Sequence, residues 1–140
     1  MEYTDYKNQA ISDLSNYTQF KARADTLTRQ IDMLSDIVNT TCDKSNVSNP
    51  AHSVPDCIAR LETLRSDLHN INFRIMCVDS TLDALTESER ELITSFYITR
   101  QRNTVNTLAR KNYTDRSCIY RRAVKALEKY IYICFGVRKT

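Results

Sequence analysis

Two stripes of apolar residues, spaced alternately three and four positions apart, dominate the first 85 residues of the chain. The second stripe has no polar member; it consists of Val54, Cys57, Leu61, Leu64, Leu68, Ile71, Ile75, Val78, Leu82 and Leu85. This spacing puts all of its residues on one side of an α-helix. The 140 residues include one glycine, whereas average usage would give about ten. Because phosphate loops and tight hairpin turns depend on glycine, an all-α fold is expected.

The first stripe predicts a helix over residues 2–39. Its positions are Tyr3, Tyr6, Ala10, Asp13, Tyr17, Phe20, Ala24, Leu27, Ile31, Leu34 and Val38, of which only Asp13 is polar. The segment 39–55 is rich in Asn, Ser and Thr and contains both prolines, which predicts a loop. Two long helices around such a connection favour an antiparallel, coiled-coil-like hairpin over residues 1–85. The hairpin is expected to close on itself or to pair with a second copy in a homodimer.

The net charge of +3 conceals an uneven distribution along the chain. Residues 1–85 carry eight basic and twelve acidic side chains, and residues 86–140 carry twelve basic and five acidic ones. Residues 100–140 alone contain eleven basic and two acidic side chains. The first part is therefore suited to protein contacts, and the second part to a polyanion such as nucleic acid.

Residues 86–140 carry the signals of a three-helix, helix-turn-helix domain. Thr86 and Glu89 form a capping box, which opens a helix expected over residues 87–99. Thr104 is the expected N-cap of a short second helix over residues 105–111. The inward residues of that helix are Val105, Leu108 and Ala109. The small Ala109 side chain is what allows two crossing helices to approach closely.

A turn is expected at Asn112 and Tyr113, with Asn112 in the left-handed conformation that glycine often supplies. Thr114 or Asp115 then caps a long third helix, and the sequence does not separate these two caps. The buried face of this helix is expected to contain Ile119, Ala123, Ala126, Leu127 and Tyr130. Gly136, the one glycine, is expected to end it.

The exposed side of the first turns of the third helix supplies candidates for reading DNA bases. In a helix-turn-helix domain, the start of the second helix of the motif enters the major groove. The candidates for base contacts are Arg116, Ser117, Tyr120 and Arg121. The candidates for phosphate contacts are Arg100, Arg102, Arg110, Lys111, Arg122 and Lys125.

Four short motifs carry a family resemblance: Glu89-Arg90 followed by Phe96-Tyr97, then Leu108-Ala109, Ile119-Tyr120-Arg121 and Ala126-Leu127. With these motifs, the segment from Leu85 to Tyr130 resembles the C-terminal, promoter −35-binding domain of bacterial sigma factors, domain 4. Together with the hairpin, it is similar to small phage-encoded late transcription regulators of Gram-positive bacteria, of the autolysin-regulator type. Asn112-Tyr113 stand where the family usually has Leu-Gly. A counterpart of the sigma domain that melts the −10 element is missing, so the resemblance implies recruitment or modulation of RNA polymerase.

The sequence therefore predicts a sequence-specific regulator that binds double-stranded DNA in the cytoplasm of a bacterial host cell. One alternative is a protein-interaction factor, such as an anti-sigma or host-takeover adaptor, in which the hairpin is the functional part. A second is the small subunit of a phage DNA-packaging machine. The sequence has no triad-like spacing, metal-ligand pair or phosphate loop, so neither an enzyme nor a metal or cofactor site is expected. No apolar run approaches the roughly 20 residues that a membrane span needs, so no membrane partner is expected.

Overall fold

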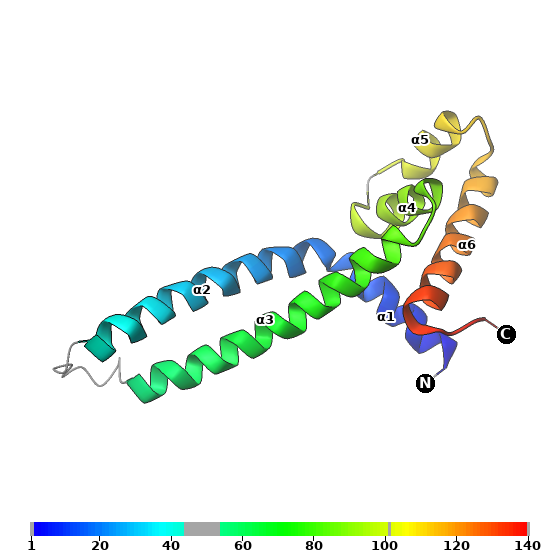
Figure 1. The fold of residues 1–140 in the computed structure, drawn as a ribbon. Helices are drawn as coiled ribbons and strands as arrows, with labels where there is room; N and C mark the ends of the chain where they lie inside the picture. Colours follow the sequence, from blue (N-terminus) through cyan, green and yellow to red (C-terminus); the bar gives the residue numbers. More distant parts are fainter. Residues whose placement is uncertain (1, 44–53, 101, 140) are drawn as a thin grey trace. The chain divides into compact units, whose positions relative to one another are not determined.

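The computed structural model describes residues 2–43, 54–100 and 102–139, and within these ranges the chain contains helices and no strand. The all-α fold expected from the sequence is confirmed. Figure 1 shows, in chain order, α1 (Tyr3–Ser15), α2 (Tyr17–Asp43), α3 (Val54–Asp83), α4 (Glu87–Ile93), the π-helical turn η2 (Thr94–Ile98), α5 (Thr104–Lys111) and α6 (Arg116–Phe135). None of these helices is both long enough and apolar enough to cross a bilayer.

The chain forms two compact units. We call Met1–Thr18 together with Ile75–Thr140 the terminal unit, and Gln19–Arg74 the central unit. This division differs from the expected boundary between residues 1–85 and 86–140. It differs because α1 and the last turns of α3 contribute to the same core as α4, α5 and α6: Ala10, Leu14, Val78 and Leu82 are buried in that core.

The helix expected over residues 2–39 is interrupted at Asn16, which ends α1 with a non-helical backbone (φ −98°, ψ 2°). Asparagine favours such positions because its side chain competes for backbone hydrogen bonds. Leu14 is fully buried, whereas Asp13 is half-buried and accepts a hydrogen bond from Gln9 Nε2 at 3.0 Å. The apolar stripe therefore shifts by one residue at the end of α1, which explains why Asp13 is its single polar member.

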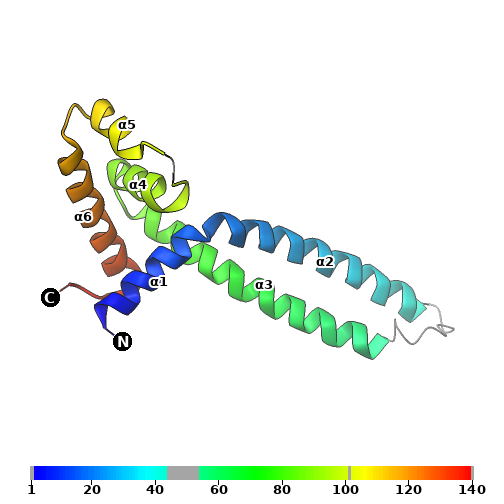
Figure 2. The same cartoon turned by 180° about the vertical axis from the view of Figure 1, so that it is seen from behind.

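In the central unit, α2 and α3 run side by side in opposite directions, as Figures 1 and 2 show from two sides. Its buried side chains all belong to the two heptad stripes: Ala24, Leu27, Cys57, Leu61 and Leu64. The Arg74 guanidinium lies 5.6 Å from the centre of the Phe20 ring, a cation–π contact between the two helices. The observed pairing therefore uses the stripes that the sequence predicts.

The loop expected over residues 39–55 is shorter than predicted. Residues 39–43 continue α2, and Val54 and Pro55 already belong to α3. Proline is compatible with the first turn of a helix, where its missing N–H needs no partner. Residues 44–53 of the expected loop lie outside the described residues.

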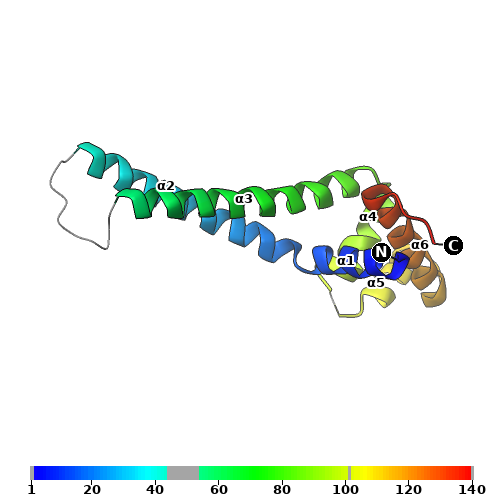
Figure 3. The ribbon, with the colours of Figure 1, turned by 90° about the horizontal axis from the view of Figure 1, so that it is seen from below.

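The terminal unit gathers α1, α4, α5 and α6 around one core, seen from below in Figure 3. The largest side chains that are fully buried in it come from four helices, α1, α3, α4 and α6; they are Leu14, Val78, Ile93, Ile119, Tyr130 and Ile131. The rings of Tyr6 and Phe135 meet at 5.3 Å between centres, so α1 and α6 complete the core together. The buried face expected on α6 is confirmed, and Ile131 adds to it.

The helix expected over residues 87–99 changes its hydrogen-bond pattern halfway. The capping box is confirmed: Glu89 N donates to Thr86 Oγ1 at 3.2 Å, and Thr86 N donates to Glu89 Oε1 at 3.0 Å. After Ile93 the helix widens into η2, where Thr99 N donates to Thr94 O, five residues earlier, at 2.9 Å. Such π-helical turns are rare and occur frequently at functional sites.

Candidate nucleic-acid interface

The four base-contact candidates lie together on one exposed face of α6. Ile119 and Ala123 point into the core of the terminal unit, whereas Arg116, Ser117, Tyr120 and Arg121 are exposed. These four residues follow the spacing i, i+1, i+4 and i+5, so they form a stripe along the first two turns. The buried side of α6 therefore fixes which side chains the helix offers to a partner.

The connection between α5 and α6 is a Schellman motif. Thr114 N donates to Ala109 O at 3.0 Å, and Tyr113 N donates to Arg110 O at 3.3 Å. Tyr113 takes the left-handed conformation, with φ 52°. The prediction that Asn112 would do so is wrong: Asn112 has φ −98°, and its Nδ2 donates to Leu108 O at 2.9 Å. Tyr113 thus has a backbone conformation that glycine adopts freely.

The caps of the two helices also differ in part from the prediction. Asp115 is the N-cap of α6, with φ −78° and ψ 156°, which decides between the two caps that the sequence left open. Thr104 is the first residue of α5 rather than its cap. The cap is Asn103, which has φ 60°. A residue with a Cβ rarely adopts this conformation, but asparagine tolerates it better than most.

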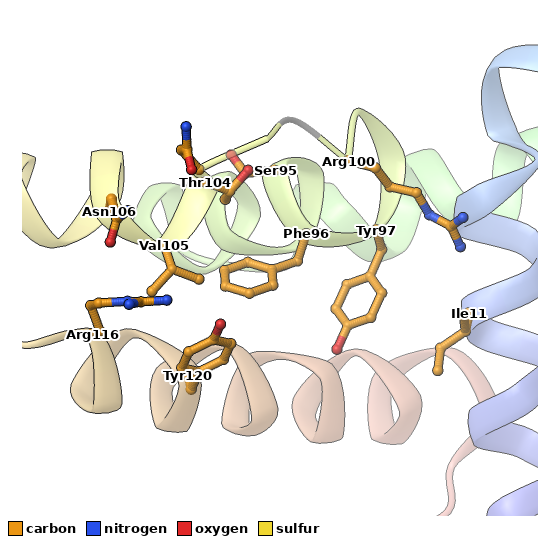
Figure 4. Close-up of a pocket in the computed structure, with 11 residues that line it drawn as sticks. Ile11, Ser95, Phe96, Tyr97, Arg100, Thr104, Val105, Asn106, Arg116 and Tyr120 are labelled. Atoms are coloured by element: carbon orange, nitrogen blue, oxygen red, sulfur yellow. The ribbon is translucent and has the colours of Figure 1, made fainter.

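A groove of about 580 Å³ lies between η2, α5 and the start of α6. Figure 4 shows Phe96 of η2 facing Tyr120 of α6, with Tyr97 beside Phe96, Arg116 near one end of the groove and Arg100 near the other. The Phe96 and Tyr120 rings meet edge to face, 6.0 Å apart and inclined by 67°. Among the described residues that line this groove there are two arginines and no acidic side chain, so it favours an anionic ligand.

Arg100 stands apart from the other phosphate-contact candidates. Its Nη2 donates to Ser15 Oγ of α1 at 2.6 Å, and its backbone is left-handed, with φ 50°. The neighbouring Ile11 of α1 lines the same end of the groove. Arg100 therefore connects the end of η2 to α1, and it is not grouped with the base-contact stripe of α6.

Lys111 is engaged by an acidic neighbour. Its Nζ lies 2.7 Å from Glu91 Oε1, and the hydrogen bond with Glu91 raises the pKa of Lys111. Exposed ion pairs of this kind contribute little to stability and exchange readily. The carboxylate of Glu91 therefore offsets part of the positive charge that Lys111 offers to an anion.

The remaining phosphate-contact candidates are exposed. They are Arg102 between η2 and α5, Arg110 on α5, and Arg122 and Lys125 on α6. A hydrogen bond with Thr114, followed by the charges of Arg122 and Arg121, lowers the pKa of the Cys118 thiol. The start of α6 therefore has a local field that stabilises negative charge.

Asn106 is a residue that the sequence analysis missed. It is exposed on α5, lies one turn before Arg110, and lines both the groove at η2 and a second hollow beside Tyr113. A helical wheel of α5 would have found it, because it places Asn106 at the edge of the buried face and on the same side as Arg110, one turn later. An amide side chain at this position can hydrogen-bond either a base or a phosphate.

Within the ranges that the structure describes, no group of three or more His, Cys, Asp or Glu side chains is arranged to hold a metal ion. Basic and uncharged polar side chains, together with aromatic rings, supply the chemistry of the exposed face of α5 and α6. Groups of this kind are suited to hydrogen bonding, charge pairing and stacking. Comparison of the chain with family models, with curated proteins and with solved structures finds no match.

Proposed function

We propose that the chain is a sequence-specific regulator of transcription that binds double-stranded DNA through a helix-turn-helix formed by α5 and α6. One observation carries the proposal: Arg116, Ser117, Tyr120 and Arg121 share one exposed face at the start of a helix whose opposite face is buried. A helix presented in this way fits the major groove of B-DNA. The family resemblance of residues 85–130 supports the same reading.

In this proposal, Arg116 and Arg121 bind guanine O6 and N7, and Ser117 and Tyr120 contact neighbouring bases. Arg102, Arg110, Arg122 and Lys125 bind phosphates on either side, and Lys111 joins them when it releases Glu91. Arg100 has a supporting role, because its side chain is already bonded to Ser15. Phosphate contacts set the position of the helix on the duplex, and base contacts select the sequence.

We further propose that the protein recruits or modulates RNA polymerase in the bacterial cytoplasm. This proposal rests on the resemblance to sigma-domain-4-like phage regulators. The chain acts without catalysis and without a cofactor in this reading. The central unit provides a protein contact, and its exposed apolar side chains favour a homodimer: Met33, Ile37, Ile58 and Phe73. A dimer would bind two half-sites related by its two-fold axis.

A selection from a randomised duplex pool, followed by binding measurements over a range of salt concentrations, tests the proposal. The wild type is expected to enrich one motif, and the logarithm of its affinity should fall linearly with the logarithm of salt concentration. Arg116→Ala and Arg121→Ala should each lower the affinity for the enriched motif by roughly 5- to 150-fold, because a bidentate arginine–guanine contact is worth about 1–3 kcal/mol.

Arg110→Ala should instead weaken the binding of all sequences alike and reduce the salt slope by about one. Arg29→Ala is the matched control, because Arg29 is an exposed basic residue of the central unit. No enrichment of any motif, or Arg116→Ala and Arg121→Ala proteins that bind like the wild type, would reject the proposed interface.

The alternative of a protein-interaction adaptor is favoured by the exposed apolar residues of the central unit. It predicts that a polymerase subunit or a sigma factor is retained in a pull-down by a protein that binds no DNA. Retention that is lost in Met33→Lys but kept in Arg116→Ala would support the adaptor over the regulator.

A further inference from the structure

The turn between α5 and α6 carries an unusual residue. Tyr113 has the left-handed backbone conformation, with φ 52°, and its side chain is 97% exposed. A Cβ makes this conformation costly, whereas glycine adopts it freely. Burial of the aromatic ring does not offset this free-energy cost, because the side chain is exposed. Tyrosine is therefore a poor choice for the fold at this position, and residues held in such conformations often have a function.

A shallow hollow of about 550 Å³ lies beside this tyrosine. Its walls are Asn106, Arg110, Tyr113 and Thr114, and its floor is the small Ala109. Asn106 and Arg110 are four residues apart, so they lie on successive turns along one face of α5. The hollow thus brings together a guanidinium, an amide and a phenol, all of which donate hydrogen bonds, and none of the described residues that line it is acidic.

We infer that Asn106, Arg110 and Tyr113 form a binding site for a phosphate of the DNA backbone, on the outer surface of the turn. The inference rests on the proposed DNA-binding function and adds to it a contact point that the base-contact stripe does not include. Arginine pairs with phosphate through two parallel hydrogen bonds, and the tyrosine hydroxyl is a common third donor to phosphate oxygens.

The position of the turn favours DNA over an acidic protein segment. Tyr113 precedes Arg116, the first base-contact candidate, by three residues, and only Thr114 and the cap of α6, Asp115, separate them. A duplex that receives the start of α6 in its major groove has its phosphate backbone at the rim of that groove. The hollow is open rather than enclosed, as a continuous backbone requires. Tyr113 is therefore a positioning residue that holds the duplex in register with α6.

The test compares three variants of the full chain with the wild type: Tyr113→Gly, Tyr113→Phe and Arg110→Ala. Each protein is unfolded in urea and titrated with the duplex that the wild type selects. Tyr113→Gly removes both the backbone strain and the ring, so we expect it to unfold at a higher urea concentration. We also expect it to bind DNA roughly tenfold more weakly, which corresponds to the loss of one hydrogen bond to a charged group.

Tyr113→Phe separates the hydroxyl from the ring. It should keep the urea midpoint of the wild type and lose most of the same affinity. Tyr132→Ala is the control, since Tyr132 is an exposed tyrosine near the other end of α6; it should bind DNA like the wild type. A gain in stability accompanied by a loss of affinity is a pair of changes that a purely structural role would not produce.

Three outcomes would overturn the inference. DNA affinity unchanged in Tyr113→Gly, while Arg116→Ala still loses it, removes the turn from the interface but leaves the proposed function intact. Unchanged DNA affinity with loss of a polymerase subunit from a pull-down would assign the turn to a protein partner instead. If neither the wild type nor Tyr132→Ala binds any duplex, the proposed function itself fails, and the inference fails with it.

Discussion

The Tyr17 hydroxyl donates a hydrogen bond to the Asp79 carboxylate, and this bond joins the first residue of α2 to the last part of α3. Both residues belong to the terminal unit, although 62 positions separate them in the sequence. Burial, followed by the contact with Asp79, raises the pKa of Tyr17 to about 12. The bond lies one residue after the break at Asn16, so it holds the chain where the apolar stripe changes its register.

Replacing Tyr17 by phenylalanine removes this hydrogen bond and leaves the ring in position. The free energy of unfolding is expected to fall by about 1 kcal/mol, the usual net contribution of such a bond. Urea unfolding at pH 7, followed by circular dichroism, measures the change. Tyr132→Phe is the control, because the Tyr132 side chain is exposed; an equal loss in that variant would contradict the assignment.

The difference in stability between the wild type and Tyr17→Phe should depend on pH in the alkaline range. The pKa of Tyr17 is higher in the folded protein than its ordinary value of 10.0, so the unfolded state loses its proton first. The stability that the neutral hydroxyl contributes is therefore complete below pH 10 and is lost as the pH rises from 10 to about 12. The difference in unfolding free energy between wild type and Tyr17→Phe should shrink over this range. A constant difference would mean that Tyr17 titrates normally.

Ala109 is buried on the side of α5 that packs into the core of the terminal unit, so a larger side chain would have to displace its buried neighbours. Ala109→Leu is expected to lower the free energy of unfolding by about 1–3 kcal/mol through overpacking. Ala22→Leu, at an exposed position of α2, should change it by less than about 0.5 kcal/mol. Equal stabilities of the two variants in urea would show that α5 and α6 cross less closely than described.

In the proposed complex, Glu91 would compete with a DNA phosphate for the Lys111 ammonium group. Replacing Glu91 by glutamine removes a negative charge and frees Lys111, so DNA affinity is expected to rise roughly threefold at low salt. The salt dependence should become steeper by about one counterion. Fluorescence anisotropy at several salt concentrations measures both quantities. Glu62→Gln, on the exposed face of α3 in the central unit, should alter neither; weaker binding by Glu91→Gln would remove Lys111 from the interface.

The exposed apolar side chains of the central unit lead to a prediction about the oligomeric state of the protein. Met33 is 67% exposed on α2, and Phe73 is 57% exposed on α3. If these side chains form a homodimer interface, light scattering should give twice the chain mass for the wild type and the single-chain mass for Met33→Lys with Phe73→Lys. Thr26→Lys, at another exposed position of α2, should leave the mass unchanged. A wild type that is monomeric at all concentrations would contradict the dimer.

Much of the fold follows from local sequence signals. Three features depend on residues close in sequence and are present in the structure. They are the stripe from Val54 to Leu85, the capping box of Thr86 and Glu89, and the end of α6 at Gly136. The break at Asn16 was missed because one polar residue in a long stripe looks like a tolerated exception. Its cause is the burial of Leu14 against a core formed by distant residues, which helical periodicity does not contain.

The residues of the candidate interface could be predicted from the sequence, but their long-range hydrogen-bond partners could not. Burial of Ile119 and Ala123 determines which residues of α6 are exposed, and this follows from spacing alone. The partner of Lys111 lies 20 positions earlier and that of Arg100 lies 85 positions earlier, so neither could be read from the sequence. Tyr113 was overlooked because propensity favours asparagine in the left-handed conformation. The hydrogen-bond pattern of the turn, rather than propensity, decides which residue adopts it.

The ring contact between Tyr6 and Phe135 has a consequence for the order in which the protein folds. Within residues 1–140, α1 is made long before α6, which supplies part of its apolar packing, so α1 completes its contacts only after most of these residues have been made. Contacts between such distant residues slow folding, because the chain between them must first be ordered. The central unit, whose helices are made early and contact each other, has no such delay. We therefore expect synthesis to produce a folded middle segment while both future ends of the core remain open, with α1 exposing Ala10 and Leu14 to solvent or chaperones.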